Sequence, residues 1–217
     1  MSFKHSYGVI FIAGLAFLAL ATVARAEPYR IVGFGDSLMA GYGLDAGQSF
    51  PEKLENALRQ KGHDVVIAKA GVSGDTTSGG LARLDWSIPD GTSLVILELG
   101  ANDMLRAIDP EIAEKNLDAM IARLKERDIE VLLAGMRAAP NLGPDYQAAF
   151  DAIYPRLAEK YGVALYPFFL DGVAADPALL LQDGMHPNAI GIDRIVERIL
   201  PTVEKAIAAS PSNSQGG

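Results

Sequence analysis

YRIVGFGDSLMAGYG, residues 29–43, decides the fold because it joins a short apolar run to a glycine-rich loop. The run at 29–34 has the length and composition of a strand that is buried on both faces. A chain with several such strands predicts a sheet whose two faces are both covered by other elements. Similar runs recur at 64–69, 93–99, 129–135 and 163–169.

Segments with apolar residues at helical spacing separate these runs. The first opens on Ser49 as a plausible N-cap, with Pro51 early and Gly62 just past its end. Strands that alternate with helices favour right-handed crossovers and a parallel sheet. We therefore expect an α/β protein, a three-layer α/β/α sandwich with a central parallel sheet of about five strands in flavodoxin-like order. Further helices are predicted at 110–128, at 144–162 with a kink at Pro155, and at 188–209.

Both ends of the chain differ in composition from its middle. Lys4 precedes an uncharged run over 9–21, and ARA at 24–26 offers small residues where a signal peptidase reads. The run is shorter than the roughly 20 residues that a membrane-spanning helix needs, and a retained anchor is the alternative. We expect a periplasmic or secreted protein with a signal peptide over 1–26, one domain over 27–209 and a disordered tail over 210–217.

The charge balance and the absence of cysteine exclude several classes of function. Removal of the leader with Lys4 and Arg25 leaves 17 basic and 27 acidic residues, which is a net charge of −10. Such a surface repels nucleic acid and anionic membranes, so we expect no nucleic-acid partner and no stable membrane insertion of the mature chain. Without cysteine, disulfides, thiolate zinc sites and a cysteine nucleophile are excluded. We expect a monomer.

Loops at the carboxyl ends of the predicted strands carry most of the chemically informative residues. Ligands of open parallel sheets bind at this edge. His63 comes just before the second strand and therefore at the opposite edge, so His186 is the only histidine of the mature chain available to a site there. The loops span 35–44, 70–80, 100–106, 136–146 and 182–188.

Three side chains on these loops are suited to nucleophilic catalysis. Ser37 directly follows the first strand, where a sharp exit would expose its hydroxyl. Asp183 lies three residues before His186, so one turn can supply a base and the carboxylate that orients it. The alternatives are that Ser37 only caps a helix and that His186 is an ordinary surface residue. Ser73 is the reserve nucleophile, and the chain lacks the G-x-S-x-G elbow of α/β-hydrolases.

Acyl transfer also needs hydrogen-bond donors for the oxyanion, each of which lowers the barrier by roughly 3–4 kcal/mol. The candidates are the backbone N–H groups of Ser37 and Gly74 and the side-chain amide of Asn102. Gly74 and Asn102 each have an ordinary alternative as turn residues.

The residues around these candidates form four short blocks, GDSL at 35–38, SGDT at 73–76, GAND at 100–103 and DGMHP at 183–187. In order and spacing the blocks resemble those of the SGNH, or GDSL, hydrolases, and the resemblance covers essentially the whole mature chain. ELGANDMLR and AIYPRLA are further similar to bacterial multifunctional esterases of this family.

The resemblance implies a secreted serine hydrolase that needs no metal and no other cofactor. It implies Ser37, Asp183 and His186 as a catalytic triad, and Ser37, Gly74 and Asn102 as the oxyanion hole. The implied substrates are aryl esters, acyl thioesters and lysophospholipids. An exported enzyme rarely meets acyl-CoA, which favours lysophospholipids or small exogenous esters.

The substrate pocket is expected to have walls of mixed small and apolar side chains. Such walls suit a linear acyl chain in an open groove. The candidate wall residues are Leu38, Met39, Asp75 in a loop over 75–81, Leu105, Arg106, and Pro140 in a loop over 138–143.

Other functions are compatible with parts of this pattern. A carbohydrate deacetylase of the same fold is the alternative among hydrolases, and a non-catalytic lipid-binding or glycan-binding module is the alternative outside them. Asp36, Asp75 and Asp103 at one edge could also hold a divalent cation in a phosphatase-like site. The simpler interpretation is that Asp36 and Asp75 accept backbone hydrogen bonds and that Asp103 caps a turn.

Overall fold

The computed structural model describes residues 27–210. Within this range five strands form one parallel sheet in the order β2-β1-β3-β4-β5. This is the flavodoxin-like order, and the predicted fold class is confirmed. The strands are β1 (Tyr29–Gly35), β2 (Val65–Gly71), β3 (Leu94–Glu98), β4 (Glu130–Ala134) and β5 (Ala164–Tyr166).

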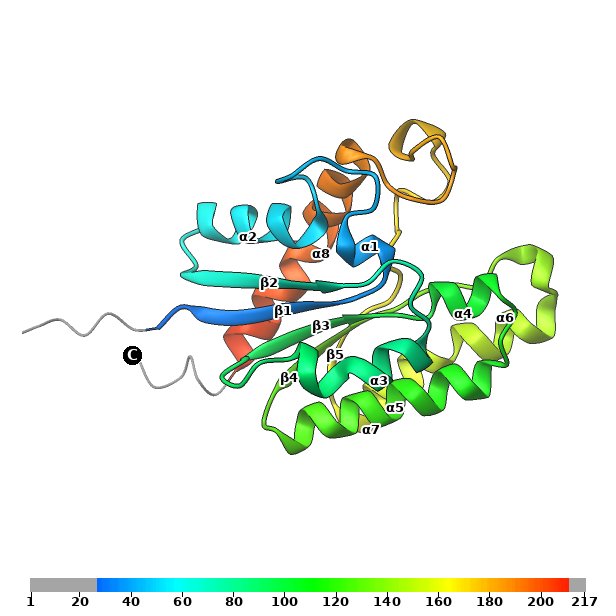
Figure 1. Ribbon diagram of the computed structural model, residues 1–217, viewed down its shortest axis with the longest axis horizontal. Coiled ribbons are helices and arrows are strands. Elements are labelled where there is room, and N and C mark those ends of the chain that lie inside the picture. Colours follow the sequence, from blue (N-terminus) through cyan, green and yellow to red (C-terminus); the bar gives the residue numbers. More distant parts are fainter. Residues whose placement is uncertain (1–26, 211–217) are drawn as a thin grey trace, which may run out of the picture.

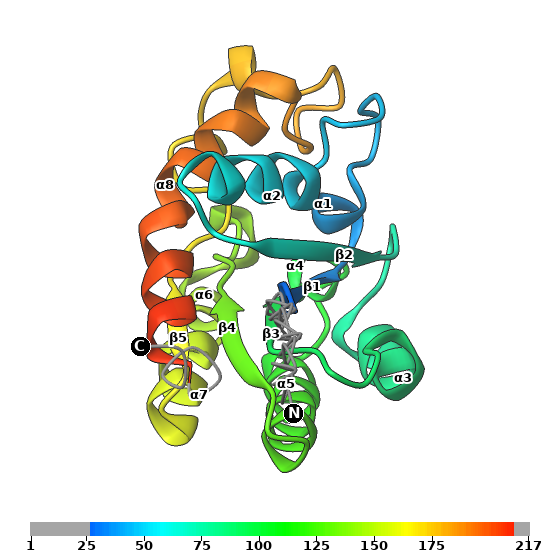
Figure 2. The ribbon, with the colours of Figure 1, turned by 90° about the vertical axis from the view of Figure 1, so that its left-hand side faces the viewer.

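Helices cover both faces of the sheet, as Figures 1 and 2 show. One face carries α1 (Ser37–Ala40), α2 (Phe50–Gln60) and α8 (Ala189–Ala209). The other face carries α3 (Thr77–Ser87), α5 (Pro110–Glu126) and α7 (Ile153–Tyr161). The remaining short helices are α4 (Ala101–Leu105), α6 (Pro144–Asp151), and the 3-10 turns at Pro140–Leu142 and Pro177–Leu179.

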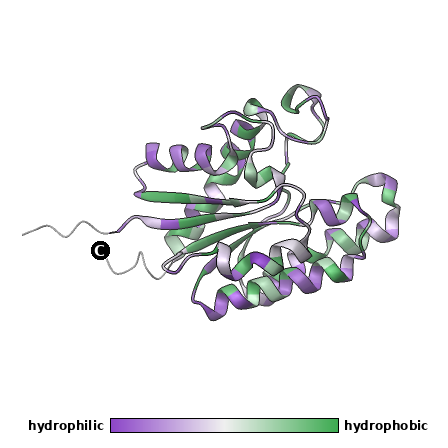
Figure 3. Ribbon diagram, in the orientation of Figure 1, coloured by the Kyte–Doolittle hydropathy of each residue, from purple (hydrophilic) through white to green (hydrophobic). Residues whose placement is uncertain are grey.

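The strands supply the centre of the core. Every residue of β3 is buried, and in Figure 3 the strands are mostly hydrophobic while α2 and α5 carry hydrophilic residues as well. In α5 the buried Leu117, Ile121 and Leu124 recur at the spacing that brings side chains to one helical face. The sandwich therefore forms a rigid support for the loops at the carboxyl edge of the sheet.

Two predicted helix boundaries follow from local sequence. Helix α2 begins after Ser49, whose N–H donates to Glu52 Oε2 at 3.2 Å in a capping box. The predicted helix over 144–162 is divided at Ala152 into α6 and α7. Pro155 explains the division, because it has no N–H to donate to the carbonyl four residues earlier.

Helix α3 corrects the predicted loop over residues 75–81. Gly79 and Gly80 have poor helix propensity, so this segment did not have the pattern of a helix. The structure compensates with tertiary contacts: the Thr77 N–H donates to Asp103 Oδ2 at 2.8 Å. Gly80 packs closely against Leu99, because a Cβ at position 80 would lie 2.3 Å from Leu99 Cδ1.

The fifth strand is shorter than predicted. Only Ala164–Tyr166 of the predicted 163–169 pairs with β4. Pro167 has no N–H and cannot continue the ladder, which explains where the strand ends. The chain then bends, and the Phe169 N–H donates to the Gly135 carbonyl at 2.8 Å.

Among residues 27–210, no helix is long and apolar enough to cross a membrane. The predicted signal peptide over 1–26 and residues 211–217 of the predicted tail lie outside the described residues.

Candidate active site

Ser37 occupies the first position of α1, directly beyond the carboxyl end of β1. Asp36 is the N-cap, and its Oδ1 accepts the Leu38 N–H at 3.0 Å. The turn requires glycine at position 35, because a Cβ there would lie 2.4 Å from the Glu98 carbonyl oxygen. This sharp exit leaves the Ser37 N–H without a hydrogen-bond partner among residues 27–210.

The loop before α8 brings His186 to Ser37 across 149 residues of sequence. Ser37 Oγ lies 2.9 Å from His186 Nε2, and His186 Nδ1 lies 2.7 Å from Asp183 Oδ2. The second carboxylate oxygen, Oδ1, accepts the N–H groups of Met185 and His186 at 2.9 and 3.0 Å. The loop is anchored by the Leu181 N–H, which donates to the His186 carbonyl at 2.7 Å.

These contacts determine where the imidazole carries its proton. The backbone N–H of His186, then that of Met185, then the imidazole lower the pKa of Asp183 from 3.8 to about 2. Asp183 is therefore a carboxylate at neutral pH and can only accept, so Nδ1 must be the protonated nitrogen. Nε2 is then free to accept the Ser37 hydroxyl proton.

Tyr42 is a further neighbour of His186 that the sequence analysis did not single out. The two ring centroids lie 4.4 Å apart with the planes tilted by 35°. Tyr42 belongs to the glycine-rich loop after Ser37, but its contact with a residue near the end of the chain has no local sequence signal.

The three predicted oxyanion donors line the same cavity. Gly74 has φ of +85° and its N–H, like that of Ser37, has no partner within the described range. Asn102 in α4 donates one amide N–H to Asp36 Oδ2 at 2.9 Å. Because a primary amide has two N–H donors, Asn102 retains one for a ligand.

The cavity beside Ser37 has a volume of about 620 Å³ and mostly apolar walls. Three of the candidate wall residues, Leu38, Leu105 and Pro140, line it. Five further apolar residues line the cavity and were not named from the sequence. Met104 and Met136 belong to the loops after β3 and β4 that were predicted to lie at this edge, whereas Phe168, Leu170 and Leu180 follow β5.

Three predicted wall residues lie outside this lining and are corrected here. Met39 is 0% exposed, because the helical turn of α1 directs it into the core. Asp75 turns away to pair with Arg83, with Nε and Oδ2 2.6 Å apart. Arg106 donates to the Gly74 carbonyl at 2.9 Å, which holds the peptide of that glycine.

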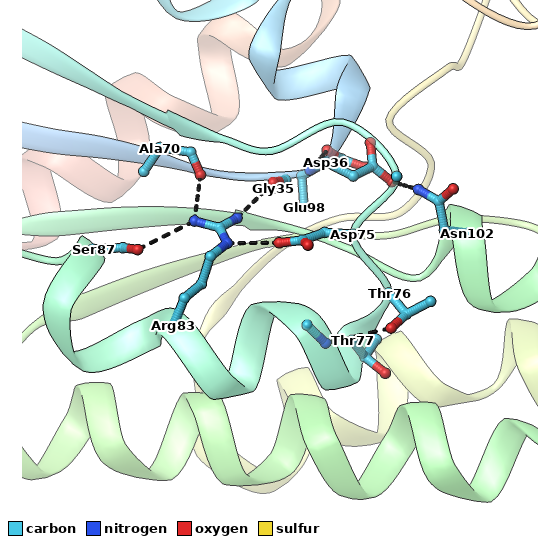
Figure 4. A network of polar contacts seen from close by, with 12 residues as sticks. Gly35, Asp36, Ala70, Asp75, Thr76, Thr77, Arg83, Ser87, Glu98 and Asn102 are labelled. Atoms are coloured by element: carbon cyan, nitrogen blue, oxygen red, sulfur yellow. Dashed lines mark hydrogen bonds and ion pairs between the residues drawn. The ribbon is translucent and has the colours of Figure 1, made fainter.

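Arg83 connects the ends of β1 and β2, as Figure 4 shows. Its guanidinium donates to the carbonyls of Gly35 and Ala70 at 2.8 and 2.9 Å and lies 4.0 Å from the centre of the Phe34 ring. The strand ends that support Ser37 and Gly74 are thus fixed by one buried cation, which sequence reasoning also missed.

The acids considered for a cation site have other partners. Among the described residues, no three His, Asp or Glu side chains are grouped closely enough to hold a metal ion. Asp36 accepts a backbone N–H as predicted, whereas Asp75 binds a side chain instead. Asp103 accepts both the N–H and the hydroxyl of Thr77 from α3, at 2.8 and 2.6 Å, and so caps a helix distant in sequence.

Ser73, the reserve nucleophile, also lines the cavity. It lies on the loop with Gly74, but the imidazole nitrogen that could activate a hydroxyl is bonded to Ser37. The geometry therefore favours Ser37 over Ser73.

Comparison with known proteins identifies the family of this chain. Residues 34–194 match the model of the GDSL-like lipase/acylhydrolase family. An arylesterase of Vibrio mimicus is 42% identical over 79% of this chain and 86% of its own length. A thioesterase 1/protease 1/lysophospholipase L1 of Escherichia coli is 38% identical over 79% of this chain and 82% of its own.

A solved structure provides the same comparison in three dimensions. The crystal structure of AlinE4, an SGNH-hydrolase family esterase, shares 50% identity and superposes with a TM-score of 0.71 over 85% of this chain and 99% of its own. The fold, the family match and these relatives agree. The chain therefore belongs to the GDSL-like lipase/acylhydrolase family and is an ester hydrolase of the SGNH type.

Proposed function

We propose that this protein hydrolyses carboxylic esters and thioesters through an acyl-enzyme on Ser37. The observation that carries the proposal is the 2.9 Å contact between Ser37 Oγ and His186 Nε2, with Asp183 2.7 Å from the other imidazole nitrogen. A hydroxyl becomes a nucleophile when a neutral imidazole can take its proton, and this contact supplies that pathway.

In the first half of the reaction, Ser37 Oγ attacks the acyl carbonyl carbon as its proton passes to His186 Nε2. Asp183 stabilises the resulting imidazolium and keeps its orientation. The tetrahedral oxyanion accepts hydrogen bonds from the Ser37 N–H, the Gly74 N–H and the remaining N–H of Asn102. When the carbonyl re-forms, the bond to the leaving oxygen or sulfur breaks, and His186 returns the proton to that atom.

In the second half, water takes the place of the leaving group. His186 Nε2 accepts a proton from water as the water oxygen attacks the acyl carbon. The same donors stabilise the second oxyanion. Collapse of this intermediate releases the carboxylic acid and returns the proton to Ser37.

We infer that substrates have an apolar acyl group. The cavity of about 620 Å³ beside Ser37 is lined mostly by apolar side chains, which suits an alkyl or aryl chain. The relative from Vibrio mimicus is named an arylesterase, and the one from Escherichia coli is named a thioesterase and lysophospholipase. Aryl esters, acyl thioesters and lysophospholipids are therefore the substrate classes to test. With the signal peptide expected over 1–26, we propose a periplasmic or secreted location, where lysophospholipids and small esters are more accessible than acyl-CoA.

The test compares Ser37→Ala with Ser73→Ala across p-nitrophenyl esters, acyl thioesters, lysophospholipids and acetylated sugars. Ser37→Ala should lose roughly 10⁴-fold or more in kcat with an unchanged thermal melt. Ser73 lines the same cavity, so Ser73→Ala is the matched control. Its kcat should stay within about tenfold of the wild type, because the substitution removes no oxyanion donor. Retained turnover in Ser37→Ala would refute the proposal, and hydrolysis restricted to acetylated sugars would favour the deacetylase.

A further inference from the structure

Asp36 is a buried acid that precedes Ser37 and contacts Asn102, two of the proposed oxyanion donors. Its side chain is fully buried, with Oδ1 accepting the Leu38 N–H at 3.0 Å and Oδ2 accepting the Asn102 amide at 2.9 Å. Figure 4 shows the Asn102 amide directed toward this carboxyl group. Asp36 therefore joins the helical turn that carries the nucleophile to the side chain proposed as an oxyanion donor.

A carboxylate at this position determines which end of the Asn102 amide faces it. The oxygen and nitrogen ends of a primary amide have almost the same shape but opposite hydrogen-bonding roles. Because an ionised carboxylate only accepts, the nitrogen must face Asp36, which leaves the second N–H of the same nitrogen available to the cavity. We propose that Asp36 is a positioning residue whose carboxylate fixes the amide of Asn102 as an oxyanion donor. The inference rests on the proposed function.

The charge on Asp36 is unfavourable for the fold. The pKa of Asp36 is raised to about 6, and burial is the largest cause. The N–H groups of Leu38 and Asn102 and the nearby His186 act in the opposite direction and lower it. Asp75 on the β2–α3 loop raises it slightly. The nearest buried cation, Arg83, is already paired with Asp75.

A second buried acid, Glu98 at the end of β3, lies beside Asp36. It is fully buried, its Oε2 accepts the Asp36 N–H at 3.4 Å, and its Oε1 has no hydrogen-bond partner within the described residues. Burial and the neighbouring Asp36 raise the pKa of Glu98 well above its ordinary value. A second negative charge beside Asp36 is therefore disfavoured at this position.

The folded state thus retains a proton on Asp36 more strongly than the unfolded state does. Since the folded pKa lies above the ordinary 3.8, the contribution of this group to stability falls as pH rises from about 4 to about 6. Above pH 6 the enzyme keeps a buried charge that a neutral residue would avoid. Capping of α1 does not explain why this position carries a charge, because asparagine caps helices as well as aspartate does. Orientation of the Asn102 amide does explain it, because that role needs a group that can only accept hydrogen bonds.

The experiment is a double-mutant cycle between Asp36→Asn and Asn102→Ala, with kcat, KM and melting temperature measured for each. The asparagine introduced at position 36 can still cap Leu38, but its NH₂ group faces Asn102 and makes that amide turn its oxygen inward. We expect kcat of Asp36→Asn for a p-nitrophenyl ester to fall about tenfold or more, with KM changed less than threefold. In the Asn102→Ala background the same change should alter kcat less than about twofold.

The stability readout separates positioning from a merely structural role. The melting temperature of Asp36→Asn at pH 7.5 should exceed that of the wild type by about 2 °C or more. This difference should shrink as pH falls from 6 to 4, because the wild-type carboxylate becomes protonated. Asp103→Asn is the matched control: it changes a buried acid one residue from Asn102 that faces α3, and it should keep kcat within about threefold without raising the melting temperature.

Three outcomes would overturn the inference: kcat of Asp36→Asn within twofold of the wild type, an equal loss in the Asn102→Ala background, or an Asp36→Asn chain that does not fold. Ser37→Ala measured in the same assay identifies the other failure. If that variant remains active, the proposed acyl-enzyme is wrong and the positioning role falls with it. If it is inactive while Asp36→Asn is unaffected, only the role of Asp36 is refuted.

Discussion

Residues 27–210 contain two imidazole–carboxylate pairs at opposite ends of the same sheet. At the amino end, His63 Nε2 lies 3.2 Å from Glu204 Oε1 of α8. At the carboxyl end, His186 Nδ1 lies 2.7 Å from Asp183 Oδ2. Both pairs place an acid where it can orient a histidine. Of the two histidines, only His186 lines the cavity and is hydrogen-bonded to a hydroxyl group, that of Ser37.

The difference lies in what surrounds each pair. Glu204 also accepts from Lys61 Nζ at 2.6 Å, so the first pair belongs to a surface ion-pair cluster. The second nitrogen of His186 is bonded to Ser37, and the partner acid is held by two backbone N–H groups. A histidine beside an acid is therefore not sufficient to identify a site for acyl transfer. The second imidazole nitrogen must also face a nucleophile, as that of His186 faces Ser37.

The largest difference in activity should be between two variants in which one or the other histidine is replaced by glutamine. His186→Gln removes the only proposed base and should lower kcat by roughly 10⁴-fold or more. His63→Gln, the matched control, should leave kcat within about twofold and change unfolding free energy by less than about 1 kcal/mol, because exposed ion pairs contribute little. Steady-state ester hydrolysis and urea unfolding measure both. A large loss of activity in His63→Gln would remove the distinction between the two ends.

Asp183→Asn should produce the next largest effect. The amide oxygen can still accept from Met185 and His186, but the amide nitrogen would face Nδ1 and favour the tautomer with its proton on Nε2. That tautomer cannot accept the Ser37 proton, so kcat at pH 7 should fall by roughly 10³–10⁴-fold. Glu204→Gln makes the same chemical change in the other pair and should be nearly silent in the assay. Equal activities for the two variants would contradict the assignment.

The same substitution sharpens the comparison through the pH dependence of stability. The folded pKa of Asp183, about 2, lies below the ordinary 3.8, so its stabilisation is present above about pH 4 and is lost as pH falls toward 2. We expect the wild type to be more stable than Asp183→Asn at pH 6 and the difference to disappear near pH 2. Urea unfolding at several pH values measures this difference, and a gap that widens toward low pH would argue against a depressed pKa.

The smallest expected effect concerns chain length at the mouth of the cavity. Leu105 is 57% exposed and lines the cavity, whereas Ile112 on α5 is 48% exposed and does not. Leu105→Ala should reduce kcat/KM for an octanoyl ester relative to an acetyl ester by about threefold to tenfold. This loss corresponds to the free energy gained when one leucine side chain is partly buried against the acyl chain. Ile112→Ala should leave that ratio unchanged. A ratio that responds equally to both would place the acyl chain elsewhere.

General rules of the fold were sufficient to predict the parts of the site that lie at strand ends. The buried run before Ser37 and the rule that parallel sheets bind ligands at the carboxyl edge predicted the edge that would hold His186 and not His63. The parallel sheet followed from the alternation of strands and helices, and the flavodoxin-like order is one of the two common orders for such sheets. These features depend on patterns that repeat along the chain.

The features that sequence reasoning missed depend on single tertiary contacts. Helix α3 forms despite Gly79 and Gly80, since its first N–H is satisfied by Asp103. Met39 lies one position beyond Leu38, but the helical turn rotates it from the cavity into the core. Asp75 pairs with Arg83, whose guanidinium also donates to carbonyls at the ends of β1 and β2, and no local pattern indicates that pairing.

The most direct test of the central claim is to identify the residue that forms the covalent bond. After reaction with an activated alkyl phosphonate, the account predicts one adduct per chain on the tryptic peptide 31–53, located at Ser37 by fragmentation and absent from Ser37→Ala. An adduct on peptide 70–83, which contains Ser73, or equal labelling of the Ser37→Ala variant, would contradict it.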